Sequence, residues 1–392
     1  MINKKISFLV LIICLSCQQD HSFEQIDFKN TVYKMNAEID YYLKATKDGG
    51  TWAIKYNLVN EHEKALKALD IEREEVPTLA QDSIDRSFGS FVASDARPYI
   101  LDKARSHEII LFNEAHYFPY HFHFFKTFLR DLSKLDYKYL ALEGLGKGNQ
   151  TSITTLKELN NRYLTIAPVY AEMMREALAC GYEIFNYDED TGGEREKKGA
   201  QNIANFVRGK NGKTLVLCGY DHIKETETKT YWEFALAGRI KEVMNTDPLT
   251  INQTYFIERS ERRFEDQLYQ NIIPEVSQVY LDSKGQSFKD PKEPSWYDIM
   301  IFHPRTRFTS GKADWFIEGK EKLELDLSSL NLTYPTQVFA YSTDQTFEQS
   351  TPYDVSEING LDEKVNLYLP KGKYHIIVHN ATGSYRQSIT VD

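Results

Sequence analysis

Hydrophobic residues in the middle of the chain gather in short continuous runs, separated by longer stretches in which they recur every three or four positions. A short continuous run is typical of a strand buried on both faces, and the longer period is that of an amphipathic helix. The predicted strands cover residues 108–113, 137–143, 183–188, 213–219 and 248–257. The predicted helices cover residues 119–135, 154–164, 168–179, 194–208 and 229–244. This alternation predicts an α/β fold, with a parallel sheet flanked by helices.

The two ends of the chain follow other patterns. Residues 23–103 keep helical spacing and contain no convincing strand, so we expect a helical N-terminal segment. Residues 297–304 form one more candidate strand. Beyond about residue 320, apolar and polar positions alternate, and Lys371-Gly372 supplies a tight turn. This last pattern predicts a small antiparallel β-sandwich-like module.

The first 17 residues have the pattern of a secretory signal. Lys4 and Lys5 precede an apolar run over residues 6–15, and Ser16 and Cys17 follow. The run is far shorter than the roughly 20 residues that a bilayer span requires. The segment resembles the lipobox of bacterial lipoproteins, which implies acylation of Cys17 and a lipid anchor in the cell envelope, at the outer membrane.

The chain therefore divides into four expected parts. These are a lipoprotein signal peptide (1–17), a tether with the helical N-terminal segment (18–104), the α/β domain (105–318) and the C-terminal β module (319–392). The pattern of the β module is complete on its own. We therefore expect a chain that ends near Glu318 to fold its α/β domain.

Composition narrows the classes of function. The chain has 392 residues, of which 41% are apolar, and a net charge of −10, which argues against a nucleic-acid partner. Cys14 departs from the usual lipobox leucine and would leave with the signal peptide. Cys180 and Cys218 remain, and two buried thiols are favoured over a disulfide, because they end a helical and a strand pattern.

Carboxylates and histidines follow four of the predicted strands. They are Glu114 and His116, Glu143, Asp188, and His222. Ligands of open parallel sheets bind beyond the carboxyl ends of the strands, so we expect these side chains to form one site. A glutamate beside a histidine makes a general base for water, whereas two histidines and two glutamates would instead bind a divalent metal. The spacing leaves both alternatives open.

Four familiar motifs are missing from the sequence. It has no Gly-x-Ser-x-Gly elbow, which disfavours a serine hydrolase, and no His-Glu-x-x-His zinc motif. The glycine-rich stretch 144–149 lacks the spacing of a dinucleotide loop or a P-loop, and we interpret it as a loop beside the site.

Four segments together resemble a known superfamily. They are ILFNEAHYFPYHFHFF, YLALEG, GEREKKGAQNIANF and TLVLCGYDHI. They look like the superfamily of erythromycin esterases, ChaN-type haem-binding lipoproteins and Tiki/TraB-type proteins, over about residues 105–258. The resemblance places Glu114 and His116 in its first motif, Glu143 in the second, and Gly219 and His222 in the third. Arg195 falls where the esterases have an arginine before a helix.

The chain departs from that pattern at two points. Asn113 stands where the first motif has glycine, and His116 follows Glu114 by two positions, as in ChaN, and not by three, as in the esterases. The departure weakens the case for macrolide cleavage. A ChaN-like protein would bind haem or iron, and a Tiki-like one would be a metal-dependent peptidase.

Further histidines are secondary candidates. His121 lies near the start of the helix that follows the first motif, and His303 ends a candidate strand, so both are supporting candidates. His123 points away from His121 on the same helix and is assigned to the core.

The favoured function is hydrolysis of a small-molecule or peptide substrate, with His116 or His222 as general base. The alternative is a protein that holds haem or a divalent metal without turnover.

Overall fold

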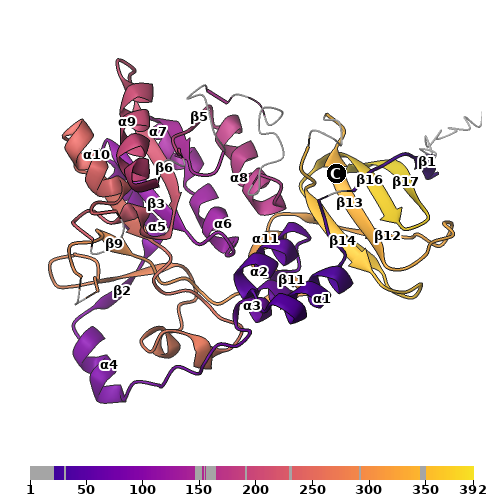
Figure 1. Ribbon diagram of the computed structural model, residues 1–392, viewed down its shortest axis with the longest axis horizontal. Coiled ribbons are helices and arrows are strands. Elements are labelled where there is room, and N and C mark those ends of the chain that lie inside the picture. The colour runs from indigo at the N-terminus through magenta and orange to yellow at the C-terminus, as the bar shows by residue number, and fades with distance from the viewer. Residues whose placement is uncertain are drawn as a thin grey trace, which may run out of the picture.

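The computed structural model describes residues 22–392 except 31, 146–151, 154, 156–164, 190–191, 229–231, 291–292 and 345–349. Cys17, most of the glycine-rich stretch and most of the helix expected at 154–164 lie outside the described residues. The sheet of the α/β domain and the C-terminal sheet lie on opposite sides of the molecule, with the first helices between them (Figure 1). No helix in this described part of the chain has the length and apolar character needed to cross a membrane.

A six-stranded parallel sheet forms the centre of the α/β domain. Its strands, in spatial order, are β5 (Glu183–Asn186), β4 (Tyr137–Leu142), β6 (Lys213–Gly219), β3 (Ile109–Glu114), β7 (Leu249–Asn252) and β9 (Ile299–Met300). The expected strands 248–257 and 297–304 are therefore shorter than the sequence indicated. The α/β fold itself is confirmed.

Helices cover both faces of this sheet. Alternate residues of β3 separate the two layers, because Ile110 and Phe112 pack toward one face and Ile109 and Leu111 toward the other. The first face carries α5 (Ala96–Ala104), α6 (Tyr120–Lys126), α7 (Leu129–Lys134) and α8 (Pro168–Ala179). The second face carries α9 (Arg195–Val207) and α10 (Leu236–Met244). The helix expected at 119–135 is thus two helices, and the one expected at 229–244 begins at Leu236.

The N-terminal segment is mainly helical, as expected. It contains α1 (Asn36–Thr46), α2 (Gly49–Leu58), α3 (His62–Leu69) and α4 (Gln81–Phe88). Two short strands were not expected. They are β1 (Glu24–Ile26), which pairs with the last strand of the chain, and β2 (Val92–Asp95), which pairs with β8 (Gln278–Leu281).

The C-terminal module has two facing antiparallel sheets. The larger one has the order β1, β17 (Gly383–Val391), β16 (Gly372–Asn380), β13 (Thr336–Ser342) and β14 (Asp354–Ile358). The smaller one pairs β12 (Glu321–Leu325) with β15 (Val365–Leu369). A hydrophobic core between the sheets contains Val338, Leu367 and Ile376.

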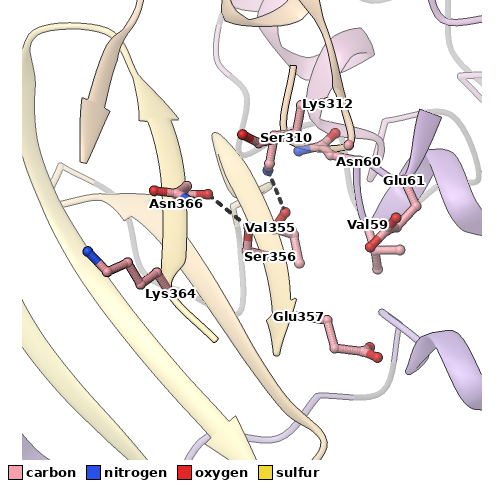
Figure 2. Close-up of a pocket in the computed structure, with 11 residues that line it drawn as sticks. Val59, Asn60, Glu61, Ser310, Lys312, Val355, Ser356, Glu357, Lys364 and Asn366 are labelled. Atoms are coloured by element: carbon pink, nitrogen blue, oxygen red, sulfur yellow. Dashed lines mark hydrogen bonds between the residues drawn. The ribbon is translucent and has the colours of Figure 1, made fainter. Parts of the chain in front are cut away.

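A buried ion pair joins this module to the rest of the molecule. Lys312 lies in β11 (Lys312–Ala313), which pairs with β10 (Phe308–Thr309) and precedes α11 (Asp314–Ile317). Its ammonium contacts the Asp354 carboxylate. It also donates to the Val355 carbonyl at 2.9 Å (Figure 2). Asn60, in the turn before α3, donates to the same carboxylate at 2.7 Å. A polar hollow of about 120 Å³ opens beside this junction.

Candidate functional site

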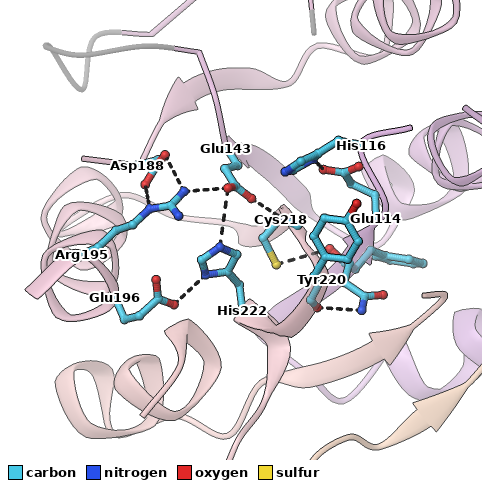
Figure 3. Close-up of polar contacts among 12 residues, drawn as sticks. Glu114, His116, Glu143, Asp188, Arg195, Glu196, Cys218, Tyr220 and His222 are labelled. Carbon is cyan, nitrogen blue, oxygen red and sulfur yellow. Dashed lines mark hydrogen bonds and ion pairs between the residues drawn. The ribbon is translucent and has the colours of Figure 1, made fainter. Parts of the chain in front are cut away.

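The carboxyl ends of β3, β4, β5 and β6 bring the expected residues together (Figure 3). Glu114 ends β3, and His116 lies in the turn that follows. Glu143 and Asp188 follow β4 and β5, and His222 lies in the short 3-10 turn Tyr220–Ile223 after β6. Parallel strands end at one edge of the sheet, so residues far apart in sequence meet there.

Glu114 and His116 form a hydrogen-bonded pair. The Glu114 Oε1 atom lies 2.6 Å from His116 Nδ1, which turns the Nε2 edge of the imidazole away from the carboxylate. Burial alone would lower the pKa of His116, but the Glu114 charge and hydrogen bond outweigh it, so this pKa is raised. Burial also raises the pKa of Glu114, which is 2% exposed, whereas the His116 side chain is 32% exposed. His116 is therefore the member of the pair that a substrate could reach.

Glu143 is the most heavily bonded carboxylate of the site. Its Oε2 atom accepts the Gly219 N–H, and its Oε1 atom lies 2.6 Å from Arg195 Nη2 and 3.6 Å from His222 Nε2. Although burial opposes ionisation, the hydrogen bond and charge of His222 hold the pKa of Glu143 well below its usual value. Glu143 is thus a fixed anion.

His222 lies between two carboxylates. Its Nδ1 atom is 2.8 Å from Glu196 Oε2, and its Nε2 atom faces Glu143. Burial lowers the pKa of His222, but these two carboxylates outweigh burial and raise it to about 10. The ring also stacks on Trp232, with centroids 4.8 Å apart. His222 is charged at neutral pH, so of the two histidines that the sequence offered as general base, the geometry leaves His116.

Arg195 joins the site as the sequence expectation placed it. Its Nε and Nη2 atoms lie 2.7 and 2.9 Å from the two Asp188 oxygens, and Nη2 also reaches Glu143. Such paired contacts fix the plane of a guanidinium. Asp188 therefore orients Arg195, and Arg195 in turn holds Glu143.

Three of these residues could hold a divalent metal. One ligand atom each from Glu114, His116 and Glu143 lies within 4.8 Å of the other two. The Glu114 Oε2 atom is buried and has no hydrogen-bond partner in the described part of the chain. A buried carboxylate oxygen without a partner is costly, and a cation would satisfy it. The donor set therefore fits a metal of the kind bound by nitrogen and oxygen ligands.

His121 and His303 take no part in these contacts and are buried in the protein core. His121 is fully buried in α6, and its Nδ1 atom accepts the Ala115 N–H at 2.9 Å. His303 bonds Ser277 and Gln253. Burial lowers the pKa of His121 to about 3 and that of His303 well below its usual value, so both are neutral, and His121 supports the turn that carries His116.

Sequence reasoning placed Gly219 in the third motif without giving it a role of its own, and it did not single out Glu196. Glu196 follows Arg195 on α9 and is 3% exposed, although a glutamate in the first turn of a helix usually faces solvent. Gly219 has no room for a side chain, since a Cβ atom there would lie 2.7 Å from His116 Cε1. The sequence signal for Gly219 was its place in the third motif, whereas Glu196 carried no signal beyond its position next to Arg195.

Comparisons with known proteins give little further guidance. No family model matches the chain, and no curated protein matches it. Solved structures show a faint likeness. The type III effector HopBA1 is 11% identical over 55% of this chain and 96% of its own, with a TM-score of 0.34. An RRSP MARTX toxin effector domain from Vibrio vulnificus CMCP6 is 12% identical over 51% of this chain and 44% of its own, with a TM-score of 0.27. We draw no functional argument from likeness at this level.

Proposed function

We propose that the protein is a hydrolase in which Glu114 and His116 activate water. The observation that carries this proposal is the 2.6 Å contact between Glu114 Oε1 and His116 Nδ1, beside an imidazole edge that is partly exposed. A carboxylate on one ring nitrogen orients the imidazole and stabilises its charged form, which leaves the other nitrogen to accept a proton.

In this mechanism, His116 Nε2 takes a proton from water as the oxygen attacks a carbonyl carbon of an ester or amide substrate. Glu114 stabilises the imidazolium that forms, and the imidazolium then returns the proton to the leaving group. One carboxylate oxygen of Glu143 lies within 4.8 Å of a ring nitrogen of His116. Arg195 and His222 neutralise the charge of Glu143, so that it does not repel the developing anion.

A divalent metal bound by Glu114, His116 and Glu143 is the second candidate. The unpartnered Oε2 atom of Glu114 favours it. Such an ion supplies a bound water of lowered pKa. The resemblance to ChaN-type and Tiki-type proteins supports this candidate, with haem as a further ligand to be tested, and we keep the membership of that superfamily as a proposal.

We also propose that the protein is anchored to the bacterial outer membrane by an acylated Cys17. The basic start, the short apolar run and the small residue before Cys17 support this. Stable anchoring requires more than one acyl chain, so intact-mass analysis of the membrane-extracted protein tests the proposal directly.

The hydrolase proposal is tested with p-nitrophenyl acetate and a panel of peptide amides. We expect H116A and E114Q to lower kcat on the order of 10²- to 10⁴-fold, as the loss of a general base does. H375A is the matched control, because His375 lies in β16 and bonds Ser388, far from the strand ends. Full activity in H116A, or no hydrolysis by the wild-type protein, would refute the proposal.

Two additional measurements separate the candidates. Loss of activity with EDTA, and recovery with Zn²⁺ or Mn²⁺, would favour the metal. Absorbance during haem titration tests the ChaN-like alternative.

A further inference from the structure

Asn113 lies near the end of the central strand β3, immediately before Glu114, and its side chain is fully buried. The neighbours of β3 are β6 on one side and β7 on the other. A polar side chain in this position must find its hydrogen-bond partners on the adjoining strands.

The Asn113 side chain bonds to both sides at once. Its Oδ1 atom accepts the Gln253 N–H at 2.7 Å, and the Gln253 side chain donates in return to the Asn113 carbonyl at 2.7 Å. Its Nδ2 atom donates to the Tyr220 carbonyl and to Thr254 Oγ1, both at 2.8 Å. One amide therefore connects the chain after β7 to the chain after β6.

Tyr220 gives this connection its importance for the site. It has a φ of 38°, a conformation that a bulky residue rarely adopts, and it is the first residue of the turn that holds His222. Its ring packs edge-on against His116, with centroids 5.2 Å apart. The backbone of Tyr220 thus sets the orientation of His222, and its ring limits where the His116 imidazole can lie.

We propose that Asn113 is the positioning residue of the site, which holds the strained Tyr220 turn so that His116 and His222 keep their places on either side of Glu143. The inference rests on the proposed role of the Glu114–His116 pair. Asn113 touches neither substrate nor reacting atoms in this account and acts through Tyr220.

Two variants test the assignment, N113A and T254V. N113A removes the bond to the Tyr220 carbonyl. T254V is the matched control, because it removes another acceptor of the same Nδ2 atom and leaves the Tyr220 bond in place. The readouts are kcat and KM for p-nitrophenyl acetate, and the ¹⁵N NMR signals of the His116 and His222 ring nitrogens. Circular dichroism checks the fold.

We expect N113A to lower kcat by up to about 100-fold, as a misplacement of about 1 Å does, while KM stays close to its wild-type value. Both histidine signals should shift in N113A and remain in place in T254V. If N113A does not fold, N113S provides the same test with a polar side chain too short to span both strands.

Unchanged histidine signals in a folded Asn113 variant would overturn the inference, and so would equal effects of T254V and N113A. If the wild-type protein does not hydrolyse p-nitrophenyl acetate, the proposed hydrolysis fails while the NMR signals still decide the role of Asn113.

Discussion

At the scale of single residues, neighbours decide what each histidine can do. His116 has one carboxylate and a partly open edge, His222 has two carboxylates, and His121 is fully buried and accepts the Ala115 N–H on its Nδ1 atom. The same imidazole is accordingly a candidate base, a fixed cation or a neutral support. The positions of His116 and His222 at the ends of predicted strands were sufficient to identify both as candidates for the site. Their roles depend on partners such as Glu196, which only the fold brings into contact.

Gly219 offers a test at this scale. Its backbone has a φ of −75°, which alanine adopts without strain, so G219A should change only the space beside His116. The new Cβ atom would lie 2.7 Å from His116 Cε1 and 3.1 Å from Glu143 Oε2, so His116 must move. We expect a loss of kcat on the order of 100-fold with little change in the thermal unfolding midpoint. Wild-type kcat in folded G219A would show that the position of His116 is unimportant.

At the scale of helices and strands, the hydrophobic pattern was a reliable guide for three neighbouring strands in the middle of the sheet. The runs that became β3, β4 and β6 are nearly continuous, and each forms a strand within one residue of its expected bounds. β1 could not be predicted in this way. Its three residues, EQI, carry little pattern, and they become a strand because β17, about 360 residues later, supplies the hydrogen bonds.

The elements α3, α6 and α11 meet in a cluster of aromatic and histidine rings. His62 of α3 packs on Trp315 of α11 at 4.9 Å, and Trp315 also contacts His123 of α6. His62 is 3% exposed, and neither of its ring nitrogens has a partner among the described residues. Burial, with the charges of Lys312 and Lys320, lowers the pKa of His62 to about 3.

This depressed pKa makes folding sensitive to acid. The unfolded chain binds a proton at His62 near pH ~6.5, whereas the folded protein does not until about pH 3, so stability falls as the pH drops between these values. For H62F, we expect the loss of unfolding free energy between about pH 7.5 and about pH 5 to be smaller by about 2 kcal/mol. Urea unfolding at both pH values measures it. An equal loss in both proteins would mean that His62 is charged or exposed when folded.

At the scale of the whole molecule, the two ends of the chain share a core. Tyr33, Ile39 and Tyr56 of the N-terminal segment pack with Phe339 and Ile377 of the β module. The sequence pattern of the β module is complete, so it suggested a separable unit. The pattern cannot show which face of a sheet is covered by a segment some 300 residues away. The packing of the N-terminal segment on the β module is such a contact, and it joins the two ends of the chain.

The shared core changes the outcome expected for a chain that ends after Glu318. Such a chain would expose the apolar faces of α1 to α3 and remove Asp354, the ion-pair partner of Lys312. We expect it to aggregate, and co-expression with residues 319–392 to restore solubility. The opposite result is a truncated chain that is soluble and monomeric and whose circular dichroism shows the helical content expected of residues 1–318. That result would show that the α/β domain folds alone.

The pH dependence of kcat/KM, compared between the wild-type protein and E114Q, tests the central claim most directly. Burial lowers the pKa of His116, but Glu114 more than compensates, so the pKa lies above the ordinary value. A protonated imidazole cannot accept a proton, so wild-type activity should fall as the pH decreases through a midpoint above ~6.5. E114Q removes the charge that raises this pKa, so its residual activity should fall only at a lower pH. A wild-type profile that is flat between about pH 5 and about pH 8, or an unchanged midpoint in E114Q, would contradict the assignment of Glu114 and His116.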